Sequence, residues 1–137
     1  MFQCVLNAAA RIITNTIKFD TGLSSVLHHD LQWLDVTERI RFQVATTLYQ
    51  CLFGRALAYL KELCFPIATS AGRCGRLRSA SSDDLVLPHY TLSTYGSRAF
   101  CVDGPVCWNS LPDYLKSPDV TFDCFRRQLK TFLFCHY

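Results

Sequence analysis

Several patterns that mark secreted, membrane-spanning or zinc-binding proteins are missing from this chain of 137 residues. No apolar run approaches the ~18 to 20 residues that a membrane-spanning helix needs. The apolar residues 1–10 lack a basic leader, and Arg11 stands where a signal-peptide cleavage region is small and neutral. None of the eight cysteines belongs to a C-x-x-C pair, which argues against a zinc knuckle and a disulfide framework. We therefore expect a cytoplasmic or nuclear protein that is neither secreted nor bound to a membrane.

A strong excess of positive or negative charge is also missing. Charged residues make up 18% of the chain, and 14 basic against 11 acidic residues leave a net charge of +3. This balance permits contact with nucleic acid without requiring it. Half of the residues are hydrophobic, which is enough to build one folded domain and argues against disorder.

Apolar residues recur at helical spacing through most of the chain. The pattern predicts helices over residues 2–17 and 25–34, from Asp35 or Thr37 to a stop at Gly54, over residues 57–64, and near the C-terminus. In that last helix Phe122, Phe125, Leu129 and Phe132 form the apolar stripe.

Residues 69–84 are small and polar and predict an exposed loop, and residues 85–88 and 99–102 predict the two strands of a small β-hairpin. The fold class is mostly α with this hairpin. We divide the chain into a helical region (1–68), the loop (69–84), and the hairpin with the C-terminal helix (85–137), together one domain.

Residues with catalytic or metal-binding chemistry are present but poorly arranged. Asp83 and Asp84 are adjacent but lie in the polar loop, so we interpret them as exposed capping or turn residues rather than metal ligands. His28 and His29 point about 100° apart if they lie on a helix, which prevents easy sharing of one metal. The glycine-bearing segment 71–76 lacks the lysine and the strand–loop–helix setting of a phosphate-binding loop. We predict no catalytic residue, metal, cofactor or small-molecule substrate.

Two basic groups are the functional candidates that the residues themselves offer. The first lies in the polar loop (Arg73, Arg76 and Arg78), and the second lies along the C-terminal helix (Arg126, Arg127 and Lys130). Such residues grip the backbone of RNA or DNA without regard to sequence. The alternative is that they form the solvated faces of a loop and an amphipathic helix.

Several segments follow one another in the order of a known family. They are VLNAAARIIT (5–14), LQWLDVTERI (31–40), YQCLFG (49–54) with YLKELC (59–64), LRSA (77–80) with LVLP (85–88), and GSRAFCVDGPVCWNSLP (96–112) with LKTFLF (129–134). This series resembles the C-terminal end of the reverse transcriptase of non-LTR (LINE-type, jockey/CR1-like) retrotransposons. Asp35 and the pair Leu57-Ala58 depart from the family pattern, which usually has proline at these positions.

The resemblance implies a fragment of an RNA-directed DNA polymerase that follows the catalytic palm and forms a thumb-like helical region. The palm and its aromatic-x-Asp-Asp turn are missing, so we expect no polymerase activity from this chain alone. Its partners would be the template–primer backbone and the missing palm. Two alternatives stay open: a stand-alone adaptor that binds protein or nucleic acid, and a non-functional translated relic that exposes the apolar side of its first helix.

Overall fold

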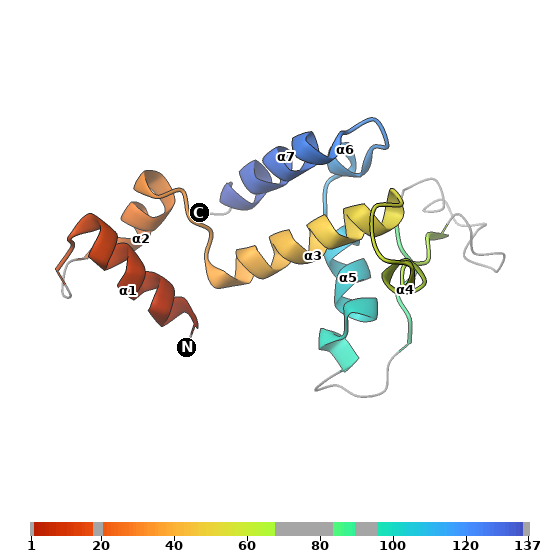
Figure 1. The fold of residues 1–137 in the computed structure, drawn as a ribbon, viewed down its shortest axis with the longest axis horizontal. Helices are drawn as coiled ribbons and strands as arrows, with labels where there is room; N and C mark the ends of the chain where they lie inside the picture. The colour runs from red at the N-terminus through yellow and green to blue at the C-terminus, as the bar shows by residue number, and fades with distance from the viewer. Residues whose placement is uncertain (1, 18–20, 68–83, 90–95, 136–137) are drawn as a thin grey trace. The chain divides into compact units, whose positions relative to one another are not determined.

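The computed structural model describes residues 2–17, 21–67, 84–89 and 96–135, and these residues are mostly helical (Figure 1). The predicted mostly α fold is therefore confirmed. The chain divides into two compact units, Met1–Phe42 with Lys130–Tyr137 (unit 1) and Gln43–Leu129 (unit 2). Among the described helices, none combines the length and the apolar composition that crossing a bilayer requires.

Unit 1 starts with helix α1 (Phe2–Thr14), and the next described helix, α2 (Leu23–Ser25), continues into the π-helical turn η1 (Val26–Asp30). Gly22 opens this second helical segment with φ of +111°, a left-handed conformation that glycine adopts without strain. The long helix α3 (Val36–Leu52) also begins in this unit. The buried apolar residues of unit 1 are Ala10, Leu27, Leu34 and Leu133.

The side chain of Gln3 ties α1 to the start of α3. Its amide nitrogen donates to Asp35 Oδ1 at 2.8 Å, and its amide oxygen accepts the backbone N–H of Val36 at 3.0 Å. Val36 is the first residue of α3, so its N–H has no partner within the helix. Gln3 thus supplies the hydrogen bond that a helix N-terminus needs.

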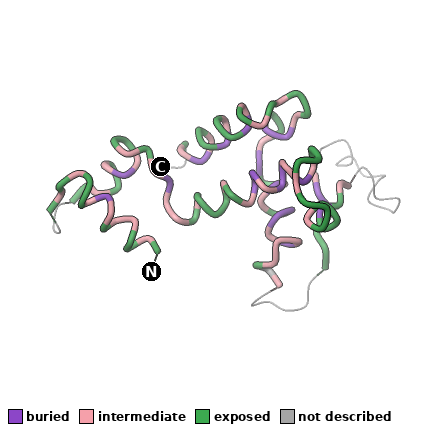
Figure 2. The backbone as a smooth tube through the Cα atoms, in the orientation of Figure 1, coloured by how far each residue is buried: buried purple, intermediate pink, exposed green. Residues whose placement is uncertain are grey.

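Unit 2 gathers the end of α3 with α4 (Ala58–Lys61), α5 (Phe100–Asn109), α6 (Asp113–Lys116) and the first part of α7 (Phe122–Phe134). Tyr49 stacks on Phe125 with ring centroids 4.5 Å apart, and its hydroxyl donates to the Val120 carbonyl. Trp108 also lies beside Phe125, at 6.1 Å, and is fully buried. All three rings are buried, and burial of such a side chain contributes about 2 to 3 kcal/mol, so these rings belong to the core of unit 2. Figure 2 colours the backbone by how far each residue is buried.

The predicted β-hairpin is wrong. Of its second strand, residues 100–102 are instead the first residues of α5 and Ala99 is the N-cap of that helix, and no strand runs through the described residues. At its first strand, Leu85 forms a single antiparallel bridge with Pro66. Residues 100–102 have side chains that favour a strand, but the helix forms because it buries Trp108 in the core. The helix also brings Gly104 into close contact with Leu48, where a Cβ on residue 104 would lie 3.4 Å from the leucine methyl groups.

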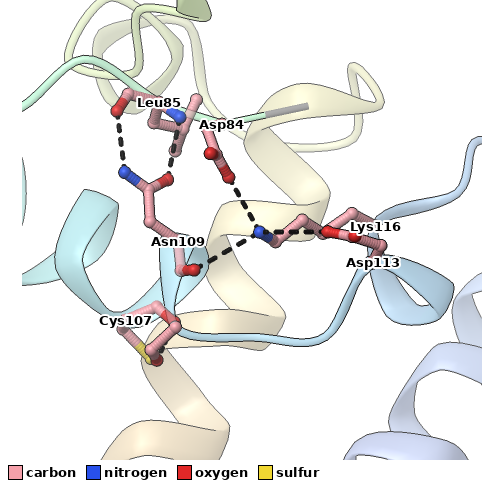
Figure 3. Close-up of polar contacts among 7 residues, drawn as sticks. Asp84, Leu85, Cys107, Asn109, Asp113 and Lys116 are labelled. Carbon is pink, nitrogen blue, oxygen red and sulfur yellow. Dashed lines mark hydrogen bonds and ion pairs between the residues drawn. The ribbon is translucent and has the colours of Figure 1, made fainter. Parts of the chain in front are cut away.

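Polar contacts hold the segment around Leu85 against α5 (Figure 3). The Asn109 side chain accepts from the Leu85 N–H and donates to the Leu85 carbonyl, each at 2.9 Å. Nearby, the Lys116 ammonium donates to Asp84 Oδ1 at 2.8 Å and lies 3.9 Å from Asp113 Oδ1. Lys116 is 6% exposed, and these two carboxylates pair with its buried ammonium.

Candidate nucleic-acid interface

The three loop arginines, Arg73, Arg76 and Arg78, lie outside the described residues. The other three predicted residues, Arg126, Arg127 and Lys130, are exposed on α7. On this helix the buried residues Phe125, Leu129 and Leu133 recur every four positions and face the protein interior. Two residues of the predicted stripe, Phe125 and Leu129, are therefore confirmed as buried, whereas Phe122 and Phe132 are only half-buried. The basic residues of α7 are exposed on a helix that Phe125 and Leu129 anchor. Their binding role stays a prediction.

Aromatic rings of α7 support two of these cations. The Arg126 guanidinium carbon lies 5.7 Å from the centre of the Phe122 ring, and the Lys130 ammonium lies 5.5 Å from the centre of the Phe134 ring. Each pair is separated by four positions, so its members are neighbours on the helix surface. A cation over a ring gains about 0.5 to 1 kcal/mol at an exposed site, which restrains a long side chain while its charged end stays in water.

A third arginine, Arg55, reaches the same ring. Its guanidinium carbon lies 6.0 Å from the centre of Phe122, and its side chain is exposed. Gly54, with φ of +75°, ends α3 and turns the chain, and the Arg55 N–H then donates to the Gln50 carbonyl at 2.8 Å. We call Arg55, Phe122 and Arg126 the arginine–phenylalanine cluster. It lies entirely within unit 2.

The cluster carries uncompensated positive charge. Within the described part of the chain, no carboxylate comes within ion-pair distance of Arg55 or Arg126. Helix α7 has one acidic residue, Asp123, against two arginines and one lysine. Guanidinium groups present a planar fork of donors that matches the oxygens of a phosphate. The guanidinium groups of Arg55 and Arg126 lie beside one ring and form no ion pair with a described carboxylate. Both groups can therefore bind the phosphates of a nucleic-acid backbone.

A cavity of about 560 Å³ lies within unit 1, lined by Ser24, Ser25, His28, His29, Asp35 and Phe134. These residue types would suit a hydrolase, but the contacts of His28 do not. Its Nδ1 contacts the Trp33 carbonyl at 2.9 Å, and its Nε2 lies 3.8 Å from Asp35 Oδ2, which is beyond hydrogen-bond distance. Nδ1 is therefore bound to a backbone carbonyl and Nε2 faces a carboxylate, whereas a general base needs one nitrogen directed at the hydroxyl that it activates.

The remaining acidic and metal-ligating residues do not assemble into a site where the structure describes them. No group of three histidine, cysteine, aspartate or glutamate side chains that could hold a metal gathers among the described residues. Asp83 lies outside these residues, and Asp84 is the partner of buried Lys116. The expectation that Asp84 is an exposed turn residue is therefore wrong, because the ammonium of Lys116 draws its carboxylate toward the core.

Family models, curated proteins and solved structures were compared with the chain, and none of them matches it. The chemistry of the arginine–phenylalanine cluster therefore carries the functional conclusion. The sequence alone could not reveal Arg55 as a member, because it lies far from Phe122 along the chain and in no basic cluster. The nearest signal is Gly54, which predicts the turn but gives no direction to the arginine that follows it.

Proposed function

We propose that this chain contacts the phosphate backbone of nucleic acid through the arginine–phenylalanine cluster, with Arg127 and Lys130 extending the contact along α7. The observation that carries the proposal is the placement of two exposed guanidinium groups, Arg55 and Arg126, over one ring. Phosphate contacts of this kind carry no information about base sequence. The chain thus binds RNA and DNA with little sequence preference and acts in the cytoplasm or nucleus.

This role agrees with the family that the sequence resembles. We propose that the chain is a post-palm, thumb-like portion of a LINE-type reverse transcriptase, without catalytic activity of its own. A thumb holds the template–primer duplex by its backbone, and exposed arginines on a helix with an anchored opposite side are suited to that task. The origin is tested by translating the genomic DNA upstream of the Met1 codon. An in-frame palm with an aromatic-x-Asp-Asp turn supports it, and unrelated sequence refutes it.

Binding is tested by fluorescence anisotropy at about 50 mM salt, with labelled RNA–DNA hybrid, duplex DNA and single-stranded RNA, each in two unrelated sequences. We expect the two sequences of each type to bind with similar affinity. We expect Arg55→Ala and Arg126→Ala each to weaken binding about 3- to 10-fold, because each removes one phosphate contact.

A matched control separates the cluster from general positive charge. Lys61 is an exposed basic residue of α4 in the same unit, so Lys61→Ala removes one charge away from the cluster. We expect that variant to bind like the wild type. A second variant, Phe122→Leu, keeps both charges but removes the supporting ring, and we expect about threefold weaker binding. Equal losses for Lys61→Ala and Arg126→Ala would refute a defined site.

A further inference from the structure

Helix α1 has its apolar side in solvent. Phe2, Val5, Ile12 and Ile13 are 78%, 64%, 81% and 59% exposed, and Ala9 lies among them on the same side of the helix. We call these five residues the α1 stripe. Leaving side chains of this size in water forgoes about 1.5 to 3 kcal/mol each relative to full burial. A continuous apolar surface of this kind is typical of an interaction site rather than of a free surface.

The polar side of α1 faces inward instead, and hydrogen bonds hold it there. Gln3 bonds to Asp35 and to the Val36 N–H, and its amide nitrogen also donates to Asn7 Oδ1 at 3.1 Å. Ala10, on that same side, is completely buried. Turning the helix to bury the α1 stripe would break the contacts of Gln3 and expose a helix N-terminus. The orientation of α1 within unit 1 is thus specified by these contacts.

We propose that the α1 stripe is a dimer interface and that its occupant is the α1 stripe of a second copy of this chain. Phe2, Val5, Ala9 and Ile12 follow the alternating spacing of three and four residues that brings two helices together along a seam. With a two-fold axis at Ala9 and the helices antiparallel, Val5 of each copy faces Ile13 of the other. The small side chain of Ala9 lets the two backbones approach closely where they cross.

The charges of α1 favour another copy over a lipid surface. Arg11 is the one charged residue of the helix, and its guanidinium donates to the Ile17 carbonyl at 2.6 Å. Two α1 helices therefore meet without opposing a row of like charges. A helix that lies on an anionic membrane usually carries several lysines or arginines on its polar side, and α1 does not.

The area of the α1 stripe sets the size class of the expected interface. The α1 stripe presents on the order of 600 Å² of apolar surface, so a symmetric pair buries roughly 1,200 Å² in total. This lies at the lower end of specific interfaces, where weak and transient complexes are found. The dimer therefore forms reversibly as the protein concentration rises. The proposal does not depend on nucleic-acid binding, which rests on the arginine–phenylalanine cluster.

Sedimentation equilibrium of the full chain between about 1 and 200 µM tests this proposal. We expect a monomer–dimer equilibrium for the wild type. Ile12→Glu places a charge in the seam at a residue that is already in water, and it should weaken the dimer at least about tenfold. Circular dichroism checks that the variant keeps its helices. Phe65→Glu changes an equally apolar residue of unit 2 that is 62% exposed, and it should leave the dimer intact.

Cross-linking tests the predicted geometry. In a background with Cys4→Ser and Cys135→Ser, Ala9→Cys should form a disulfide-linked dimer under mild oxidation, since position 9 lies at the two-fold axis. A wild type that stays monomeric at 200 µM overturns the proposal, and so does a dimer that Ile12→Glu leaves unchanged. Sedimentation of monomeric protein with anionic lipid vesicles, lost in Ile12→Glu, would assign the α1 stripe to a membrane surface and also overturn it.

Discussion

Replacing Asn109 with alanine tests the packing of unit 2 at one well-defined point. The Asn109 amide bonds to both the N–H and the carbonyl of Leu85, each at 2.9 Å (Figure 3). Leu85 is 1% exposed, so water cannot readily replace the amide at these two backbone groups. A buried donor or acceptor that loses its partner costs about 1 to 3 kcal/mol. The two groups together predict a loss of roughly 2 to 6 kcal/mol in the free energy of unfolding.

The assay is equilibrium unfolding in urea, followed by the fluorescence of Trp108, which is buried beside Asn109. The background carries Trp33→Phe so that Trp108 alone reports. The matched control is Ser110→Ala, which removes an exposed hydroxyl bonded to the Cys107 carbonyl at the end of the same helix. We expect that control to change stability by less than about 0.5 kcal/mol. Equal effects of Asn109→Ala and Ser110→Ala would refute the reasoning.

Two further predictions concern buried ionisable groups in unit 2. Lys116→Met removes the ammonium that pairs with the half-buried Asp84 carboxylate, and it should lower the free energy of unfolding by about 2 to 3 kcal/mol in the same urea assay. Adding Asp84→Asn to this variant should restore at least about 1 kcal/mol of the loss. A double variant that is no more stable than Lys116→Met would contradict the ion pair. Burial, followed by the neighbouring Cys51, raises the pKa of Cys64 from 9.0 to about 12. The folded state thus holds the thiol proton of Cys64 more tightly than the unfolded state does. This proton's contribution to the free energy of unfolding is therefore fully present below pH 9 and is lost as the pH rises toward 12. In native protein at pH 8, iodoacetamide should therefore label exposed Cys4 and spare Cys64, as read by peptide mass spectrometry, and equal labelling would refute the burial.

Local patterns predict the parts of the fold whose causes are local. The stripe through Phe125 and Leu129 predicts α7 because residues three or four apart share one side of a helix, and both are buried. Gly54 predicts the end of α3 because glycine favours the left-handed conformation that commonly follows the last turn of a helix, and its observed φ is +75°. For residues 99–102, local sequence patterns predict the wrong secondary structure. Their side chains favour a strand and Pro105 opposes a helix, yet α5 forms because burial of Trp108 and the close approach of Gly104 to Leu48 decide it.

The candidate site shows the same division. The spacing of Arg126, Arg127 and Lys130 predicts an exposed basic side of α7, because one helix fixes their relation. Arg55 joins Arg126 only through the packing of distant segments around Phe122, which no local pattern encodes. The polar anchoring of α1 by Gln3 is likewise a tertiary contact, and it reverses the side that periodicity would place inward.

The dependence of nucleic-acid affinity on salt tests the central claim most directly. The observed binding constant is measured for the wild type and for the double variant Arg55→Ala/Arg126→Ala on duplex DNA between about 50 and 200 mM salt. If both guanidinium groups neutralise phosphates, the slope of log K against log salt becomes shallower by roughly 1.5 to 2 in the double variant, and Lys61→Ala leaves it unchanged. A slope that is the same in the wild type and the double variant would contradict the account, because the arginine–phenylalanine cluster would then release no counterions.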